Sequence, residues 1–499
     1  MFFFAIISMV EVINLKKSFD NLKYIELQTK KIKERLKLFD KLYLEIGGKL
    51  FSDNHASRVL PGFEKDAKVD ILLKLKKDIE IIYCIKAEDI EKNKLRGEYG
   101  ITYDNEILNL INKSTEMGFS VNSVVITLYE GQPIVDKFIK KLKRQNIKTY
   151  IHTPTKGYPL DVNAIVSEEG YGANSYIETT KKIILVNGPG SSSGKLATCL
   201  SQLYHEHIRG INAGYAKYET FPVWNLPLKH PINLAYEAST ADIKDINIID
   251  PYHLEKYGIQ AINYNRDIET FPILKTILNK IWDKEIYFSP TDMGINTVAS
   301  CIKNMDVVIE ASKKEIVRRY YSEQANYKLG INDNEPVNKI KMLLNELEID
   351  EYYLRVVKPA LQKSEKEKRH VLSLELPNGK IITGKQTDLL SPSSSLIINA
   401  MKILTKIPDE INLLSPTVLE PILKLRREES QLSLQEVLIA LSICSVTNPI
   451  IEKAMQNIVK LNNCDAHATY IIHNGDLKAL KNLGINLTCQ PEFYSNKVF

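Results

Sequence analysis

The chain has 499 residues, of which 44% are apolar and 25% charged, the usual balance of a globular protein rather than of a disordered chain. Its 66 basic and 61 acidic side chains almost cancel, so the charge gives no reason to expect a nucleic acid partner. A chain of this length predicts two or three domains, each with its own hydrophobic core.

The cysteines and the first residues bear on where the protein works. The six cysteines have no paired spacing, so the sequence predicts neither a disulfide framework nor a zinc ribbon, and it favours a reducing cytoplasm. The apolar opening MFFFAIISMVEVI lacks a basic start and is too short to cross a bilayer. We interpret it as a leader of little meaning, with Met1 and Met9 as alternative starts, and expect a cytoplasmic protein without a membrane partner.

Strands and helices are expected to alternate through the first 300 residues. The spacing of Ile25, Ile32, Leu36 and Phe39 predicts an amphipathic helix. Continuous Ile/Val/Tyr runs separated by helical segments are typical of a parallel sheet that is buried on both faces. We expect strands in the segments 41–50, 79–87, 121–129, 147–154, 181–187 and 212–219. The prediction is an α/β domain over 20–303 with a mostly parallel, P-loop-like or Rossmann-like sheet.

The rest of the chain divides into a helical and a mixed part. Charged helical patterns without clear strands predict a helical connector over 304–366. Asn378-Gly379 is a strong signal for a two-residue turn, which predicts a hairpin. Helical patterns and a strand-like HATYIIH follow, so we expect a smaller C-terminal α/β domain over 367–499.

A glycine- and serine-rich turn lies between a predicted strand and a predicted helix, the setting that a P-loop requires. Glycines allow successive backbone N–H groups to converge on phosphate oxygens, and the start of a helix adds positive charge. The predicted phosphate-binding residues in this region are Gly188, Gly190, Ser191, Ser192, Ser193, Gly194, Lys195 and Thr198.

The turn departs from the P-loop pattern G-x-x-x-x-G-K-[ST] at two positions. Pro189 stands where the first glycine belongs, and Leu196 stands where a hydroxyl would ligate Mg²⁺. Thr198 is nearby but not at the usual position. The alternative is a turn that only caps a helix.

His205 and His207 do not predict a metal site, because residues two apart on a helix point to nearly opposite sides. We expect His205 to be hydrogen-bonded or to face substrate, and we predict no metal ligand. A metal or nucleophile role is a weaker hypothesis for Cys464, His467 and Cys489, since free cysteines are commonly small buried side chains.

A long loop rich in aromatic residues and prolines, from 221 to 237, predicts a substrate pocket. Its candidate lining residues, together with His205, are Trp224, Asn225, Lys229 and His230. Glu219 ends a predicted strand and is a candidate catalytic base or Mg²⁺ partner, alongside catalytic Lys195; the alternative is an exposed glutamate. Arg266 is a candidate second phosphate contact, or else an ion-pair partner of Asp267 or Glu269.

The sequence closely resembles a bacterial family of uncharacterised proteins, catalogued as domain of unknown function 1846 and as uncharacterised protein family 0371. The resemblance runs over nearly the full length. It is carried by strings such as HASRVLPGF, VSEEGYGANSYIET, ATCLSQLYHEHIRGINAGYAKYETFPVWNLPLKHPINLAYEASTADI, IIDPYHLEKYG, SPTDMGIN and EIVRRYY. It implies a larger N-terminal α/β part, a helical piece and a C-terminal α/β subdomain, but no activity.

This chain departs from the family pattern at the turn and at Ala173, where the family has a lysine. The first departure makes the turn similar to the Gly-Pro-x-Ser-Ser-Gly-Lys turn of uridine-kinase-like enzymes. The second removes a candidate phosphate contact.

Two functions of different classes follow. The first is a P-loop-like phosphotransferase that binds ATP or GTP with Mg²⁺ and acts on a small molecule. The second is a nucleotide- or phosphometabolite-binding regulator without chemistry, and a metal-dependent hydrolase is the weakest alternative. The cofactor and the oligomeric state stay open, with a homo-oligomer as one alternative.

Overall fold

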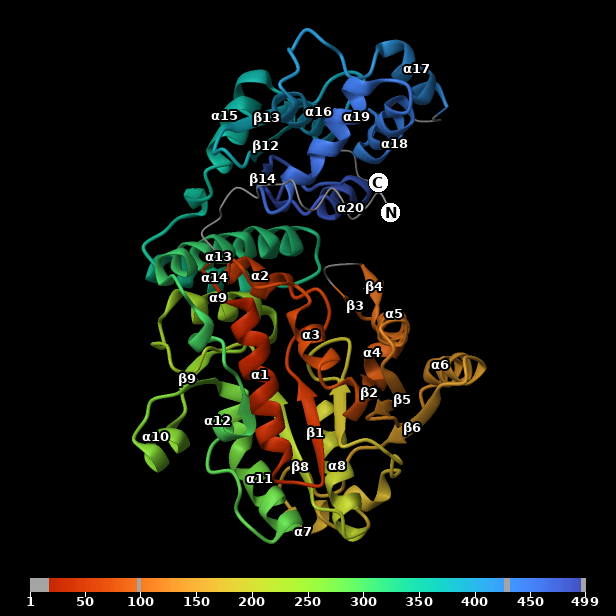
Figure 1. Ribbon diagram of the computed structural model, residues 1–499, viewed down its shortest axis with the longest axis vertical. Coiled ribbons are helices and arrows are strands. Elements are labelled where there is room, and N and C mark those ends of the chain that lie inside the picture. The colour runs from red at the N-terminus through yellow and green to blue at the C-terminus, as the bar shows by residue number, and fades with distance from the viewer. Residues whose placement is uncertain (1–17, 97–99, 426–430, 495–499) are drawn as a thin grey trace. The chain divides into compact units, whose positions relative to one another are not determined.

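The computed structural model describes residues 18–96, 100–425 and 431–494, which are coloured in Figure 1. The interpretation of the opening segment and of its two methionines lies outside these residues. Contacts divide the chain into two compact units. The larger unit comprises Lys16–Glu237 and Asp245–Ser312, and the smaller one comprises Ala238–Lys244 and Lys313–Phe499.

A seven-stranded sheet forms the centre of the larger unit, and every pair of neighbouring strands in it is parallel. The strand order is β11-β8-β1-β7-β2-β5-β6. Its strands are β1 (Lys41–Ile46), β2 (Ile79–Lys86), β5 (Ser120–Thr127), β6 (Lys148–His152), β7 (Ile183–Asn187), β8 (Ala213–Tyr218) and β11 (Gly294–Ile295). The predicted parallel α/β sheet is therefore confirmed.

Helices surround this sheet, and two short antiparallel pairs of strands lie beside it. The helices are α1 (Asn21–Leu36), α2 (Asn54–Val59), α3 (Ala67–Leu73), α4 (Ala87–Glu91), α5 (Tyr103–Glu116), α6 (Pro133–Arg144), α7 (Val162–Ile165), α8 (Lys195–Ile208), α9 (Pro231–Ser239), α10 (Pro251–Tyr257), α11 (Asn265–Trp282) and α12 (Pro290–Met293). The next helix, α13 (Met305–Lys328), begins in the larger unit and continues into the smaller one. The pairs are β3 (Leu95–Arg96) with β4 (Ile101–Thr102), and β9 (Asn247–Ile249) with β10 (Ile262–Tyr264).

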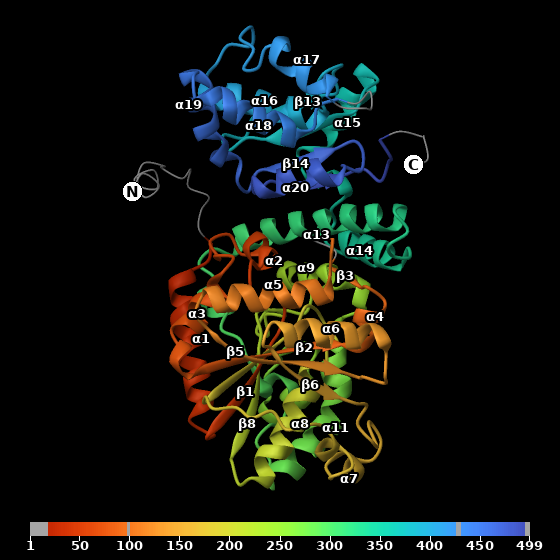
Figure 2. The ribbon, with the colours of Figure 1, turned by 90° about the vertical axis from the view of Figure 1, so that its right-hand side faces the viewer.

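Helices cover both faces of the sheet, as the continuous apolar strands require. On one face, the Cys84 thiol of β2 contacts Thr198 of α8, with Sγ 3.4 Å from Oγ1. On the other, Tyr24 of α1 and Tyr218 of β8 share a hydrogen bond of 3.1 Å between their hydroxyls. Figure 2 shows α1 and α11 on opposite sides of the sheet.

The connections of β1 and β7 leave the sheet in opposite directions. From β7 the chain passes through α8 to β8, on the far side of β1. From β1 it passes through α2 and α3 to β2, on the far side of β7. In open α/β sheets such a switch leaves a crevice at the carboxyl ends of the strands, where ligands bind.

Polar side chains define where several helices begin. Asp20 accepts a hydrogen bond from the Lys23 amide at the start of α1, and Asp53 does the same for Ala56 in α2. Ser289 and Asp292 form a capping box at the start of α12. These caps satisfy backbone N–H groups that a helix leaves unpaired.

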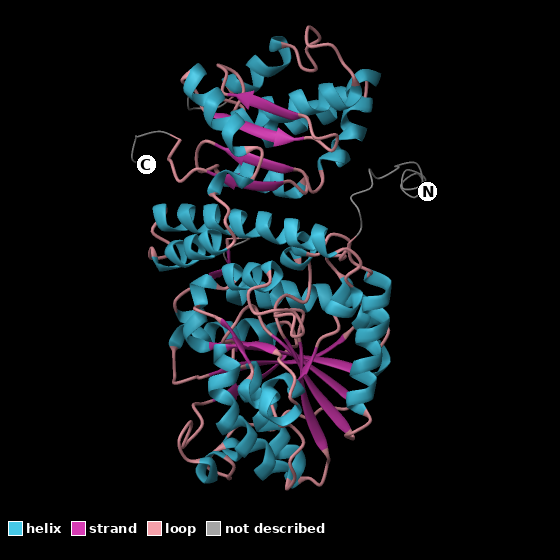
Figure 3. Cartoon of the chain, turned by 90° about the vertical axis from the view of Figure 1, so that its left-hand side faces the viewer, coloured by secondary structure: helices cyan, strands magenta, loops and turns pink. Residues whose placement is uncertain are grey.

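The smaller unit contains a mixed four-stranded sheet in the order β13-β12-β14-β15, shown with the larger sheet in Figure 3. Its strands are β12 (Val371–Glu375), β13 (Ile381–Lys385), β14 (Asp465–Ala468) and β15 (Asn486–Cys489). Its helices are α14 (Glu335–Glu346), α15 (Val357–Glu367), α16 (Pro392–Thr405), α17 (Pro416–Lys424), α18 (Leu434–Ser445), α19 (Pro449–Asn457) and α20 (Asn474–Asn482). The smaller α/β fold is thus confirmed, with Gly379 at a positive φ of 80° between β12 and β13.

One predicted strand of the smaller unit is shorter than expected. The segment HATYIIH was expected to pair throughout, but β14 ends at Ala468. Tyr470 and Ile472 are buried in the hydrophobic core without belonging to a strand. Burial alone explains their apolar character. Across the described ranges of the chain, no helix is both long and apolar enough to cross a membrane.

Candidate functional site

The glycine-rich turn occupies residues 188–194, between the end of β7 and the start of α8. Two of its residues have left-handed backbone conformations, Ser192 with φ 58° and Gly194 with φ 84°. Such residues turn neighbouring N–H groups toward one side of a loop, which favours an anion there. We call residues 188–195 the phosphate loop.

Close packing explains why the phosphate loop needs its glycines. A Cβ atom on Gly188 would lie 2.3 Å from the Ser193 Oγ, and one on Gly194 would lie 2.5 Å from the Thr127 Cγ2. Thr127, at the end of β5, also donates a hydrogen bond of 3.1 Å to the Ser193 carbonyl. The neighbouring strand therefore holds the loop in a tight turn.

Lys195 folds back over the phosphate loop, because its Nζ donates a hydrogen bond of 3.2 Å to the Gly190 carbonyl. The N-cap residue of α8 is Gly194, which provides no side-chain cap. The Ser193 hydroxyl is buried and has no hydrogen-bond partner among the residues that the structure describes. A cation, an uncapped helix start and an unsatisfied hydroxyl thus meet in one loop.

Tyr103, which the sequence analysis missed, also contacts this loop. A Cβ atom on Gly190 would lie 2.5 Å from the Tyr103 hydroxyl. Tyr103 is the first residue of α5, whose N-cap residue likewise forms no side-chain cap. The Tyr103 hydroxyl therefore borders the phosphate loop, while the Tyr103 N–H at the start of α5 donates to the Lys94 carbonyl. The strand-helix pattern around Thr127 and Tyr103 was the available signal, since carboxyl ends of parallel strands share an edge.

The hydroxyl of Thr198 does not face the phosphate loop. Its Oγ1 accepts the hydrogen bond from the Cys84 thiol, and the side chain is fully buried. Leu196 stands where a P-loop has its Mg²⁺-ligating hydroxyl. At the position where a P-loop helix ligates Mg²⁺ directly, α8 therefore offers no hydroxyl.

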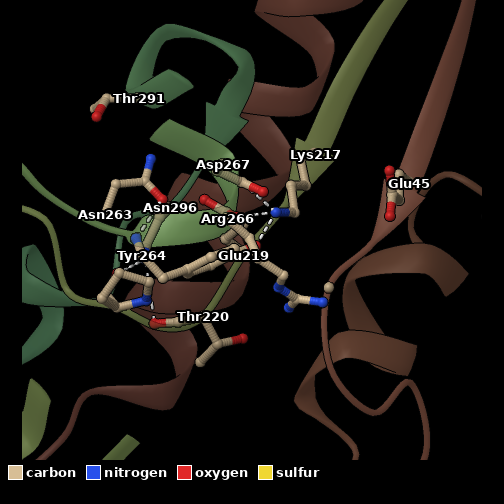
Figure 4. A network of polar contacts seen from close by, with 12 residues as sticks. Glu45, Lys217, Glu219, Thr220, Asn263, Tyr264, Arg266, Asp267, Thr291 and Asn296 are labelled. Carbon is tan, nitrogen blue, oxygen red and sulfur yellow. Dashed lines mark hydrogen bonds and ion pairs between the residues drawn. The ribbon is translucent and has the colours of Figure 1, made fainter. Parts of the chain in front are cut away.

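A second polar cluster lies at the end of β8, and Figure 4 shows it from close by. Lys217 reaches three groups with its ammonium: the carboxylates of Glu219 and Asp267 and the hydroxyl of Tyr264. The Lys217 Nζ is 3.1 Å from the Glu219 Oε1. Glu45 pairs with Lys217 in the β1–β8 register and accepts a hydrogen bond of 2.8 Å from Tyr215. We call Glu45, Lys217, Glu219, Tyr264 and Asp267 the Lys217 cluster.

The electrostatics of the Lys217 cluster set the charge of Glu219. Burial raises the pKa of Glu219 to about 7, although Lys217 opposes this shift. Burial by itself would lower the pKa of Lys217, but Asp267, Glu219 and Glu45 hold it above its usual range. Glu219, only 3% exposed, is thus a carboxyl group that exchanges a proton near neutral pH. The alternative of a solvent-exposed glutamate does not describe it.

The phosphate loop and the Lys217 cluster lie at the same edge of the sheet. Burial raises the pKa of Cys84 to about 12, and Lys195 lowers it while Glu45 raises it. Both charges also act on the Cys199 thiol in α8. Because β7, β1 and β8 are parallel neighbours, the phosphate loop and the Lys217 cluster belong to one carboxyl edge, separated by the end of β1.

Arg266 precedes Asp267 of the Lys217 cluster in the sequence, but its side chain already forms an ion pair. Its guanidinium contacts the Asp245 carboxylate, with Nε 2.8 Å from Oδ1, rather than Asp267 or Glu269. Its side chain is 41% exposed. Contact with a phosphate would require Arg266 to share or leave this ion pair.

Of the predicted pocket residues, Trp224 lies beside the Lys217 cluster, whereas the others have different surroundings. Trp224 lies against Gly294 near Glu219, and its carbonyl accepts a hydrogen bond from Ile262. Asn225 and Lys229 are exposed, and the His230 Nδ1 accepts a hydrogen bond of 3.2 Å from the Ile232 amide. Burial lowers the pKa of His230.

His205 lies at the other end of α8 from the phosphate loop, roughly 15 Å away at 1.5 Å per residue. Its Nε2 is 2.7 Å from the Asn174 carbonyl, while His207 is exposed. Glu206 is fully buried and pairs with Lys41 at 2.6 Å. His205 is thus hydrogen-bonded inside the protein, away from the loop.

Metal ligation finds no support in the placement of the candidate ligands. Within the ranges that the structure describes, no three His, Cys, Asp or Glu side chains are grouped so as to hold a metal ion. In the smaller unit, His467 contacts Thr488 at 2.8 Å, and burial lowers its pKa to about 3. The Cys464 thiol instead contacts the Lys460 carbonyl.

Comparison with known proteins shows the family. The domain of unknown function DUF1846, N-terminal, matches residues 17–348, and its C-terminal counterpart matches residues 353–499. A UPF0371 protein of Clostridium botulinum (strain Eklund 17B / Type B) is 52% identical over 97% of this chain and 99% of its own length. A UPF0371 protein of Clostridioides difficile (strain 630) is 50% identical over 97% and 100%. These names state no activity and no ligand. The chain belongs to the DUF1846 family, also called UPF0371.

Proposed function

We propose that this protein binds the phosphate groups of a nucleotide in the phosphate loop and transfers a phosphoryl group to a small molecule. One observation carries the proposal: Lys195 folds over a loop in which, among the described residues, the Ser193 hydroxyl has no hydrogen-bond partner and the start of α8 has no side-chain cap. An ammonium, a hydroxyl and backbone N–H groups are the donors that phosphate oxygens accept.

The loop favours a ligand with more than one phosphate. Two side chains approach the same residue, Gly190: the Tyr103 hydroxyl and the Lys195 ammonium. The start of α8 contributes about half a positive charge, and Lys195 adds a full one. This arrangement supports ATP or GTP over a single phosphate.

All six cysteines are free, which supports a reducing cytoplasm as the place of this activity.

A second function, nucleotide binding without chemistry, is favoured by the region after Lys195. Leu196 brings no hydroxyl, and the hydroxyl of Thr198 is turned to Cys84. Mg²⁺ would then be held by the phosphates and by water alone. A regulatory protein that only binds a nucleotide does not require a side chain that ligates Mg²⁺ directly.

Titration calorimetry with ATP, GTP and inorganic phosphate, each with and without Mg²⁺, tests the binding. Wild-type protein is expected to bind a nucleotide more tightly than phosphate. Lys195→Ala should weaken this affinity about 10- to 100-fold, because a charge-assisted hydrogen bond contributes about 1.5–3 kcal/mol. Lys182→Ala is the matched control, since Lys182 is an exposed lysine just before β7.

The outcomes separate the alternatives. If neither nucleotide nor phosphate binds the wild type, or if Lys182→Ala weakens binding as much as Lys195→Ala, the phosphate loop is not the site. Nucleotide binding with no ADP or GDP release in the presence of Mg²⁺ and small-molecule alcohols would favour the regulatory function.

A further inference from the structure

Gly294 in β11 marks a place where a carboxylate and an indole meet. A Cβ atom on Gly294 would lie 2.8 Å from the Glu219 Oε2 and 2.6 Å from the Trp224 Cζ2. The two side chains therefore share the space above this glycine, and any larger residue there would displace both.

One hydrogen-bonding atom of each side chain is left unused. The Glu219 Oε1 receives Lys217 and the Tyr264 hydroxyl, which lies 3.4 Å away. Its Oε2 accepts no hydrogen bond from the described residues. The Trp224 Nε1 is buried and also has no partner in this part of the chain, whereas the Trp282 Nε1 donates to the Ala213 carbonyl at 2.8 Å. Buried donors without partners are rare and call for a ligand or water.

In the indole ring Nε1 is two bonds from Cζ2, the atom that shares the space above Gly294 with the Glu219 Oε2. A hydroxyl group between Nε1 and Oε2 would satisfy both atoms at once. It accepts a hydrogen bond from the indole nitrogen and donates one to the carboxylate oxygen. A carbonyl or ether oxygen satisfies Trp224 but has no hydrogen for Glu219, and an ammonium satisfies Glu219 but not Trp224. The pair therefore selects an O–H group.

The charge around Glu219 selects an uncharged molecule. In the Lys217 cluster one ammonium faces three carboxylates, those of Glu45, Glu219 and Asp267. All four groups are largely buried, so their charges are weakly screened. An anionic ligand would add a further negative charge to this excess, which favours a neutral alcohol or polyol.

The Glu219–Trp224 pair lies close enough to the phosphate loop for both to take part in one reaction. Only β1 separates β7 from β8, so their carboxyl ends lie roughly 10 Å apart at the usual strand spacing. β1 is followed by Gly47 and Gly48, which bring no side chains to this edge. The three phosphates of a nucleoside triphosphate reach over such a distance.

We propose that the Glu219 carboxylate and the Trp224 indole nitrogen bind one hydroxyl group of a neutral polyol, and that this hydroxyl is the phosphoryl acceptor. The assignment rests on the proposed function. The hydroxyl oxygen attacks the γ-phosphorus of a nucleoside triphosphate held by the phosphate loop, while its proton passes to the Glu219 Oε2. The bond from that phosphorus to the bridging oxygen breaks, and the nucleoside diphosphate leaves with the electron pair. Lys217 is a positioning residue that holds the other carboxylate oxygen.

The chain has two tryptophans, so fluorescence can report on Trp224 directly. Trp282→Phe protein, with Trp224 as its only tryptophan, is titrated with glycerol, with glycerate and with 1,2-dimethoxyethane. Glycerol is a neutral polyol, glycerate adds a carboxylate, and the diether has no O–H group. If Trp282→Phe does not fold, the difference between wild type and Trp224→Phe gives the same signal.

Glycerol is expected to change the Trp224 emission saturably, with at least 10-fold weaker binding of glycerate and no saturable change with the diether. Glu219→Gln should weaken glycerol binding at least 10-fold, whereas Lys195→Ala should leave it unchanged. An absent glycerol response, an equal response to glycerate, or an unchanged affinity in Glu219→Gln overturns the assignment. Glycerol binding without nucleotide binding would instead refute the phosphate loop and leave the hydroxyl site standing.

Discussion

Lys217 and Glu219 form a buried ion pair at the carboxyl end of β8, with Nζ 3.1 Å from Oε1. The two residues are two positions apart, so both side chains lie on the same face of the sheet. Asp267, from the first turn of α11, contacts the same ammonium. Lys217 therefore holds together two carboxylates from segments far apart in sequence, and its removal would leave both without a cation.

The first prediction concerns that removal. At pH 8, where Glu219 is ionised, Lys217→Met should lower the free energy of unfolding by about 3–5 kcal/mol, because it leaves the buried carboxylates of Glu219 and Asp267 without their shared cation. Lys217→Met/Glu219→Gln should recover part of this loss, since one of the stranded carboxylates is then neutral. Urea denaturation of wild type, the two single variants and the double variant gives the coupling between the two residues. Additive effects in the cycle would show that the ion pair contributes nothing.

The second prediction is a pH dependence of stability from Glu219. Its pKa is raised by burial from 4.5 to about 7 in the folded protein, so the folded state holds this proton more tightly than the unfolded state. The resulting stabilisation is present below pH 4.5 and is lost as the pH rises from 4.5 to 7, by about 3 kcal/mol over this range. Lys217, Asp267, Glu45 and Tyr264 surround the carboxyl group.

Denaturation of wild type and Glu219→Gln at several pH values checks this dependence. The free energy of unfolding of wild type minus that of the variant should decrease between pH 4.5 and 7 and stay level above pH 8. Subtracting the variant removes the titration of all other groups that both proteins share. A difference that rises with pH would mean that Glu219 is held ionised by Lys217.

The parallel sheet and the tight turn between β7 and α8 were predictable from the sequence because each depends on a local pattern. The run IILVN in β7 is fully buried, and only a strand covered on both faces needs such continuity. The glycines of the loop reflect backbone contacts within a few residues, as at Gly194 with its φ of 84°.

The contacts between distant segments were not predictable. Tyr103 reaches Gly190 from a helix more than 80 residues earlier, and Asp245 pairs with Arg266 where Asp267 was the nearer candidate in sequence. Charge type tells which residues form ion pairs, but not which partner the fold brings within reach. The motif Tyr204-His205-Glu206-His207 suggests a metal site in the same misleading way, because its Glu206 pairs with Lys41, 165 residues away.

The third prediction concerns the backbone of the phosphate loop. Gly194→Ala places a side chain on a residue with φ 84°, which costs about 1–2 kcal/mol, and also drives Cβ against Thr127. Both effects should lower the melting temperature and weaken nucleotide binding. Gly475→Ala is the control, because Gly475 has no positive φ and its nearest neighbour would be a side-chain oxygen of Gln435 at 3.4 Å. Equal changes in melting temperature for the two variants would contradict the role of the left-handed turn.

The fourth prediction separates the two ends of α8. Glu206 is fully buried and accepts hydrogen bonds from Lys41 at 2.6 Å and from the Tyr43 hydroxyl at 2.8 Å. Glu206→Gln leaves the Lys41 ammonium without a negative partner, so the free energy of unfolding should fall by about 3–5 kcal/mol. Nucleotide affinity, measured by calorimetry at a temperature where the variant is folded, should not change, because the phosphate loop lies at the other end of the helix. His207→Ala, at an exposed neighbour, should alter neither quantity. Loss of nucleotide binding in folded Glu206→Gln would mean that the two ends of α8 are coupled, and that the buried glutamate belongs to the site.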